Sequence, residues 1–396
     1  PATMGAVSDA PHASHHPRVG WFELFYDLVV VAAVVHGSNV FAEEPSLGNG
    51  FWLAITLLIL FALWLLTILS FNTVRRESSV RRVLTLVQML ALIVASLSTS
   101  RDGGLSDATG FFWLAVAFGA LALTYLLLPT KDAEGRRSAR MTALFTGLAA
   151  VVFLIGSFVP ESDASLFANP YPYLLAMGLA LVIVPIVVST LPSLMRRGQL
   201  DREHLAERLG QLVIIVLGES FVKLVLTLGK LKTIPNPFFF ALTFAVVYCI
   251  WLIYFRSVLP AGVPESTRRL RWWLGGHYLL TFGAIGTASG FAVLAVTPFD
   301  DSADALASYR TTLPLLYVMV GFTVLALIAR PRERALVITH ATATVLLFVL
   351  AAIGAFEYTD HAMSMTAVGA LIVIGDTIAV VRLRRRQEHE QESVAS

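Results

Sequence analysis

Two carboxylates four residues apart open the first long apolar stretch of this chain. Glu23 and Asp27 lie in "ELFYDL", and "VVVAAVV" follows directly. Residues at positions i and i+4 share one face of a helix. A charge inside a bilayer costs several kcal/mol unless it is paired, hydrated or neutralised. The sequence therefore predicts that these two acids have polar partners elsewhere in the chain.

Candidate partners open a second apolar stretch, near the middle of the chain. His204, Glu207, Arg208 and Gln211 are spaced to lie on one side of the first turns of a helix. If the two stretches pack together, Arg208 neutralises one or both carboxylates, and Gln211 and histidines donate hydrogen bonds.

Two charged residues lie deeper in the same stretch. Glu219 and Lys223 are one helical turn apart, with the glutamate on the N-terminal side, which is the better orientation for an ion pair. We therefore expect the two side chains to pair. An alternative use of a buried lysine is a covalent imine with a carbonyl ligand.

Three further ionisable residues lie inside apolar stretches, each about six residues from an arginine that marks the end of the stretch. These are His277, His340 and Asp376. Their depth resembles that of Glu23 and Asp27, so all could join one cluster. Chains of Asp, Glu and His within membranes often mark proton or ion paths. The alternative is that the cluster only holds helices together, through polar contacts that average about 0.6 kcal/mol each.

Other chemistries find little support. Histidines and carboxylates could ligate a metal, but no compact H-E-x-x-H spacing is present, so no metal or cofactor is expected. The nucleotide-binding pattern G-x-x-x-x-G-K is absent as well. "GTASG" at 286–290 and the glycines at 275–276 indicate close helix packing.

The composition places these residues in a membrane. Of the 396 residues 56% are hydrophobic and only 14% are charged, and the mean hydropathy is +0.73. Soluble domains are about a quarter charged. The net charge of +2 gives no indication of nucleic-acid binding, and the single Cys249 excludes an intrachain disulfide. The chain is expected to be an integral membrane protein whose partner is the lipid bilayer.

Twelve apolar stretches are each long enough to cross the roughly 30 Å hydrocarbon layer as a helix. The sequence thus predicts an all-α, polytopic transmembrane bundle, although a ten-helix arrangement with two re-entrant stretches stays open. The expected spans are 21–41, 51–72, 82–100, 110–129, 140–159, 172–195, 205–229, 237–256, 271–296, 311–329, 334–355 and 363–381.

The arginines orient the predicted bundle. All but five of the 29 lysines and arginines lie at one set of alternate connections, which includes "RRESSVRR" and "RLRRR". Positively charged connections stay on the cytoplasmic side. Both termini are therefore predicted to be cytoplasmic.

A weak internal repeat divides the chain. "ELFYDLVVV" at 23–31 aligns with "ERLGQLVII" at 207–215, and Trp64 aligns with Trp251. Two six-helix halves in the same orientation are parallel repeats. The predicted divisions are an N-terminal tail at 1–20, the first repeat at 21–195, the second at 196–382 and a C-terminal tail at 383–396.

The same motifs give the chain a family resemblance. "WFELFYDLVVVAAVVH", "HLAERLGQLVIIVLGES" and "IWLIYF" followed by "GGHYLL" resemble the bacterial low-temperature-requirement A family over most of the chain. That name records a growth phenotype. The resemblance implies a multi-helix inner-membrane protein with Glu23, Asp27, Glu207, Arg208 and Glu219 in family motifs. His204, Gly218 and Ser220 lie in these motifs too, whereas Lys223 lies outside them.

Three functions fit these features. A secondary transporter or permease for an unknown small molecule or lipid is favoured by twelve helices, parallel halves and a shared polar centre. An intramembrane enzyme would use Asp27 or Glu23 as a general acid on a lipid or isoprenoid. A scaffold or sensor would use the cluster for structure alone, and any of the three could form a homo-oligomer.

Overall fold

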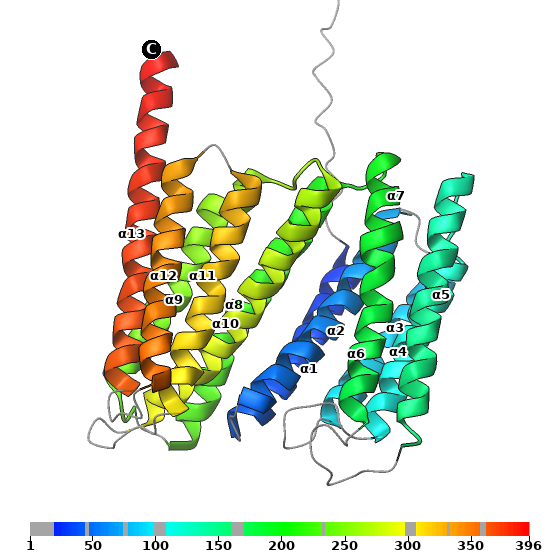
Figure 1. Ribbon diagram of the computed structural model, residues 1–396, viewed down its shortest axis with the longest axis horizontal. Coiled ribbons are helices and arrows are strands. Elements are labelled where there is room, and N and C mark those ends of the chain that lie inside the picture. The colour runs from blue at the N-terminus through cyan, green and yellow to red at the C-terminus, as the bar shows by residue number, and fades with distance from the viewer. Residues whose placement is uncertain are drawn as a thin grey trace, which may run out of the picture.

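The computed structural model describes residues 20–43, 47–73, 78–98, 108–159, 170–231, 234–297, 306–330, 333–356 and 362–395. Within these ranges twelve helical segments are long and apolar enough to cross a membrane. They run side by side as a bundle, with the end of the last helix and the start of the first on the same side (Figure 1). The twelve-helix expectation is therefore confirmed. The predicted N-terminal tail lies outside the described residues.

Ten of the spans are single helices, and two are interrupted. The helices are α1 (Trp21–Glu43), α2 (Leu47–Thr73), α3 (Ser79–Leu97), α4 (Ala108–Leu126), α5 (Ala133–Gly156), α6 (Tyr171–Pro185), α7 (Leu191–Arg196), α8 (Arg202–Leu231), α9 (Pro237–Ile253), α10 (Thr267–Val296), α11 (Leu306–Ala329), α12 (Arg334–Phe356) and α13 (Ala362–Ala395).

The interruptions are wider π-helical turns next to prolines. In the sixth span, Ile186–Thr190 follows Pro185 and joins α6 to α7. In the eighth span, Tyr254–Val258 follows α9 and precedes Pro260. Proline lacks the N–H that a regular helix needs and crowds the preceding turn. The sequence predicted both spans but not their interruptions.

The last helix extends further than predicted. The last apolar span was predicted at 363–381, whereas α13 continues as a helix to Ala395, through the segment predicted as a cytoplasmic tail, and projects beyond its neighbours (Figure 1). The segment after Gly375 contains no proline or glycine and is rich in arginine, glutamate and glutamine. These are good helix formers, so nothing in the sequence ends the helix where it leaves the apolar layer.

Glycines bring α10 and α11 close together. A Cβ atom added at Gly283 would lie 2.6 Å from the backbone nitrogen of Val318, and one at Gly321 would lie 2.9 Å from that of Leu280. Close helix packing was also expected at 275–276 and 286–290. It occurs at Gly276 and Gly286, where an added Cβ would meet side chains of α11 at 2.9 Å.

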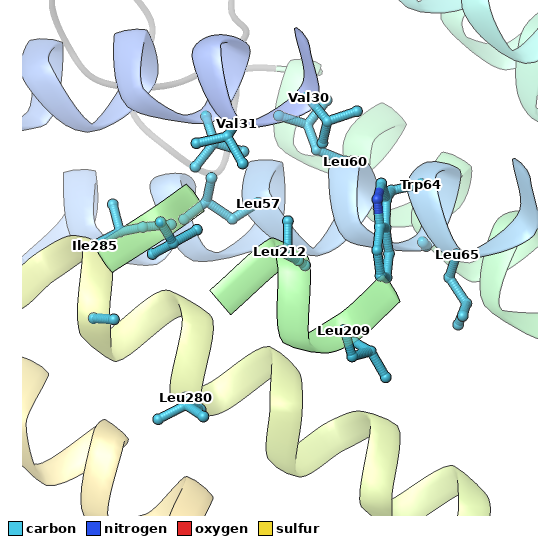
Figure 2. Close-up of a cluster of buried hydrophobic side chains, with 14 of the residues drawn as sticks. Val30, Val31, Leu57, Leu60, Trp64, Leu65, Leu209, Leu212, Leu280 and Ile285 are labelled. Carbon is cyan, nitrogen blue, oxygen red and sulfur yellow. The ribbon is translucent and has the colours of Figure 1, made fainter. Parts of the chain in front are cut away.

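The middle of the bundle is a seam between helices from the two parts of the chain. Here α1 packs on α2, α8 and α10, and α8 packs on α10. Figure 2 shows apolar side chains of α1, α2, α8 and α10 converging there, among them Val30, Trp64, Leu212 and Ile285. We call the facing sides of these four helices the central seam. It is the element that positions the polar residues described next.

Candidate functional site

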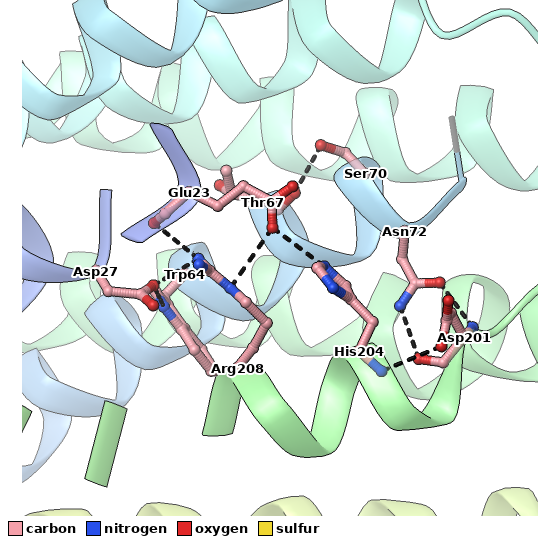
Figure 3. A network of polar contacts seen from close by, with 9 residues as sticks. All are labelled: Glu23, Asp27, Trp64, Thr67, Ser70, Asn72, Asp201, His204 and Arg208. Atoms are coloured by element: carbon pink, nitrogen blue, oxygen red, sulfur yellow. Dashed lines mark hydrogen bonds and ion pairs between the residues drawn. The ribbon is translucent and has the colours of Figure 1, made fainter. Parts of the chain in front are cut away.

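An ion pair between α1 and α8 lies at the centre of the seam. Arg208 Nη2 donates to Asp27 Oδ1 at 2.6 Å and to the carbonyl oxygen of Glu23 at 3.0 Å. Both Asp27 and Arg208 are completely buried. The predicted contact between the two carboxylates and the second polar stretch is therefore confirmed as geometry (Figure 3).

A second ion pair lies beside the first, toward the end of the bundle where both helices begin. His204 Nε2 lies 3.1 Å from Glu23 Oε2, and Arg208 Nε lies 3.8 Å from the same oxygen. The side chain of His204 is 14% exposed and that of Glu23 is 16% exposed. The four residues thus form a continuous polar layer across α1 and α8, which we call the Asp27 cluster.

The aromatic partner of Asp27 was missed by the sequence analysis. Trp64 Nε1 on α2 donates to Asp27 Oδ1 at 2.7 Å, and its ring is fully buried. Next to it, Tyr26 donates to Thr67 Oγ1 at 3.2 Å, and Gln88 Nε2 of α3 donates to the same hydroxyl at 3.0 Å. Within an apolar run a tryptophan is usually a packing or interface residue, so no sequence pattern indicated this role.

Several atoms of the Asp27 cluster have unused hydrogen-bonding capacity. Asp27 Oδ2, Arg208 Nη1 and the amide oxygen of Gln211 are buried and have no hydrogen-bond partner among the described residues. An unsatisfied buried donor or acceptor costs about 1–3 kcal/mol. Asp27 Oδ2 and Arg208 Nη1 are a free acceptor and a free donor of one ion pair, and Gln211, outside the cluster, lies about one turn beyond Arg208 on α8. The cluster is therefore able to bind a polar species.

Lys223 does not form the expected ion pair. Its ammonium donates to Ser38 Oγ of α1 at 3.3 Å and to Ser289 Oγ of α10, whereas no carboxylate lies within ion-pair distance in the described part of the chain. Glu219 is half-buried and remains its charged neighbour on α8. The long lysine side chain reaches across the seam because two hydroxyls lie within its range there.

Glu207 lies outside the Asp27 cluster, contrary to expectation. Its side chain is exposed, while Arg208 beside it is buried. Consecutive helical residues are rotated by about 100°, so the position next to a buried residue generally points elsewhere. The spacing from His204 to Gln211 therefore placed Glu207 on the wrong side of the helix.

His277 is held separately as a neutral ring. Its Nδ1 lies 2.8 Å from the carbonyl oxygen of Trp273, and its Nε2 lies 3.2 Å from the hydroxyl of Tyr254. A carbonyl can only accept, so Nδ1 carries the proton and Nε2 accepts from tyrosine. Both ring nitrogens are thus satisfied by α10 itself and by the π-helical turn that follows α9, and the residue does not join the Asp27 cluster.

His340 and Asp376 pair with each other instead of with the seam. His340 Nδ1 of α12 lies 2.9 Å from Asp376 Oδ2 of α13, and both side chains are buried. The ring of Phe322 stacks on the imidazole of His340, with 5.7 Å between the ring centroids. Their helices pack chiefly on α9 and α11. A similar predicted depth in the membrane therefore did not place these two residues in the Asp27 cluster.

The described residues contain no group of three His, Cys, Asp or Glu side chains arranged to hold a metal ion. A bundle of twelve apolar helices around a buried polar layer defines a polytopic integral membrane protein.

The chain belongs to the bacterial low temperature requirement A protein family, whose model matches residues 18–378. The resemblance stated from the motifs is confirmed. A protein of Rhizobium meliloti (strain 1021), itself named only as uncharacterized, is 25% identical over 292 residues, which is 69% of this chain and 67% of that protein.

Proposed function

We propose that this protein is a secondary transporter or permease of the bacterial inner membrane, with the Asp27 cluster as its substrate or coupling-ion site. The single observation that carries the proposal is the buried Asp27–Arg208 pair, which joins α1 to α8 and leaves polar atoms of both residues without partners in the described part of the chain. Transporter sites typically lie between two structural halves, within the membrane.

The energetics of the pair support a function more than a purely structural role. Replacing a buried ion pair by well-packed apolar residues is often neutral or stabilising, so such a pair is weak evidence for stability. Here the pair also leaves Asp27 Oδ2 and Arg208 Nη1 unsatisfied, which adds to its cost. An arrangement selected only to hold α1 and α8 together would bury apolar side chains.

The free groups suggest the kind of solute. Asp27 Oδ2 and the Gln211 oxygen can accept hydrogen bonds, and Arg208 Nη1 can donate one. A small solute that carries both a cationic and an anionic group matches this set, because its ammonium would face the carboxylate and its carboxylate would face the guanidinium. We therefore propose a small zwitterion as the first class to test.

The test is electrical recording from proteoliposomes adsorbed on a solid-supported membrane. Mixtures of zwitterionic amino acids, of dicarboxylates and of organic amines are applied as concentration jumps in separate runs. We expect a current with the amino acids. We expect Asp27→Asn and Arg208→Gln to remove it while the purified proteins keep their wild-type elution volume.

The matched control is Glu265→Gln. This carboxylate is 91% exposed and should be dispensable for transport. The proposal is wrong if none of the three mixtures gives a current and none of the same solutes, radiolabelled, enters the proteoliposomes faster than empty liposomes, or if Asp27→Asn transports as the wild type does.

A further inference from the structure

We propose that the central seam is a proton path in which Lys223, hydrogen-bonded to Ser38 and Ser289, is a second proton-binding station beyond the Asp27 cluster, and that the proton is therefore the coupling ion. This inference rests on the proposed transport function and adds the ion and its route. Three observations carry it: the position of Lys223, the cavity between the two stations, and the partners of the ammonium.

The two stations lie on the same sides of the same helices. Asp27 and Ser38 are both on the seam side of α1, and Arg208 and Lys223 are both on the seam side of α8. At about 1.5 Å of rise per residue, the spacing along α1 and α8 puts roughly 16–22 Å between the stations. Together they cover more than half of a hydrocarbon layer about 30 Å thick.

A small cavity lies between the stations. Its volume is about 30 Å³, and its walls come from all four helices of the seam. Val30 and Leu212 are one turn beyond Asp27 and Arg208, and Ile285 is one turn before Ser289. Trp64 contributes to the wall while its indole nitrogen donates to Asp27, so one side chain joins the cavity wall to the first station. Figure 2 shows Trp64 beside Val30, Leu57 and Leu212 of the same wall.

The size of the cavity limits its occupant, and its walls are apolar apart from the Thr281 and Tyr278 hydroxyls and the Trp64 indole nitrogen. A water needs about 10–15 Å³ of such space, so one or two waters fit but an organic solute does not. The hydroxyl of Thr281 is a buried polar group in this wall, without a hydrogen-bond partner among the described residues. Water bound there would bridge part of the gap between Asp27 Oδ2 and the second station.

The partners of Lys223 favour proton exchange over a fixed charge. Ser38 and Ser289 donate their own protons to the carbonyl oxygens of Val35 and Ile285, so toward the ammonium they only accept. Among the described residues Glu219 is the charged group that acts on Lys223, and α9, which also packs on α8, carries no Asp, Glu, Lys, Arg or His. An ammonium held by hydroxyls alone keeps its full cost of burial in the membrane.

The transfer itself is simple. A proton leaves the Lys223 ammonium as a neutral amine forms, passes along a chain of waters of which the water beside Thr281 is one member, and protonates Asp27 at the free oxygen Oδ2. The return step reprotonates the amine from the far side, where half-buried Glu219 lies one turn away. No bond other than O–H and N–H bonds is made or broken, and no redox partner is needed.

The experiment measures charge displaced by pH jumps, in the absence of any substrate, with proteoliposomes on a solid-supported membrane. The decisive variant is Lys223→Arg, because a guanidinium keeps the positive charge and the serine contacts but does not release its proton. We expect Lys223→Arg and Lys223→Met to lose most of the displaced charge. Thr281→Val should slow its displacement at nearly unchanged size.

The matched control for the cavity is Thr312→Val. This hydroxyl on α11 is also buried and without a partner in the described structure, but it does not line the cavity. Elution volume and thermal unfolding in detergent establish that each variant is folded. The inference is overturned if Lys223→Arg displaces charge as the wild type does, because the lysine then acts only as a fixed cation.

The outcomes separate this inference from the proposed function. Proton displacement that depends on Lys223, without transport of any solute mixture, would support the path and refute the transporter. Solute transport that needs Asp27 but is unaffected by Lys223→Arg would support the transporter and refute the path.

Discussion

At the scale of single residues, Asp27 and Arg208 compensate each other's buried charge. We predict that Arg208→Met lowers the free energy of unfolding by about 3–5 kcal/mol, because it leaves a buried carboxylate uncompensated. The double change Asp27→Leu/Arg208→Met should cost less than the single one, although Trp64 then loses its acceptor. Denaturant unfolding in detergent of both single variants and the double variant measures the coupling. Additive losses would mean that the two side chains do not interact.

Tyr254 and His277 make a contrasting case. The hydroxyl of Tyr254 satisfies the acceptor nitrogen of a buried neutral imidazole. Tyr254→Phe should therefore cost about 1–3 kcal/mol of stability by leaving that nitrogen unpaired. Transport currents and pH-jump currents should be unchanged once the folded fraction is accounted for. A variant that is stable but inactive would place His277 in the functional machinery after all.

At this scale the sequence could predict that a residue needs a polar partner, but not always which residue on another helix is that partner. The pairing of Asp27 with Arg208 could be predicted because isolated charges in apolar helices need partners. The partner of Lys223 could not be found in this way, because two serines on other helices compete with the glutamate one turn away. The pairing of His340 with Asp376 depends on which helices are neighbours, and local spacing does not contain that information.

At the scale of helices, α10 and α11 pack closely because glycines at their contact have no side chain. We predict that Gly283→Ala costs about 1–3 kcal/mol, because its methyl group would approach the backbone of Val318, which cannot move aside as a side chain can. Gly275→Ala on the same helix is the matched control, since an added Cβ there meets nothing within 4 Å. Thermal unfolding in detergent compares them. Equal melting temperatures would show that α11 shifts to make room.

The positions of the helices were the most predictable feature. Length and hydropathy placed all twelve spans, because a bilayer imposes the same thickness on each of them. The ends were less predictable where no breaker residue is present. Thus α13 continues through Arg382 and Arg386 as a helix, although its apolar part ends before them. The cytoplasmic position of 383–396 stays a prediction, and the structure adds that this segment is helical to Ala395.

At the scale of the whole molecule, the arginine distribution predicts the orientation in the membrane. We expect the basic end, which includes Arg82 and Arg382, to face the cytoplasm, with both termini on that side. In a Cys249→Ser background, a membrane-impermeant thiol reagent added outside intact cells should label a cysteine at Ser46, between α1 and α2. It should not label one at Ser79, whose side chain is exposed at the opposite end. Labelling at 79 but not at 46 would reverse the orientation.

The proposed division into two parallel halves stays a prediction. The first helix of each proposed half, α1 and α8, do meet at the seam. Their polar residues are not equivalent, however, because Asp27 aligns with Gln211, and buried Trp64 aligns with Trp251, which is 40% exposed. The polar residues of the seam therefore differ between the two proposed halves.

The separation of Asp27 and Lys223 along α1 and α8 has an electrical consequence, to the extent of its component across the membrane. A unit charge that crosses a full bilayer gains or loses about 2.3 kcal/mol per 100 mV. Over the roughly 16–22 Å between the two stations, a proton would therefore experience about 1.2–1.7 kcal/mol per 100 mV. That energy corresponds to roughly a tenfold bias in which station is occupied. The resting voltage of the cell would thus set the protonation of the seam before any solute arrives.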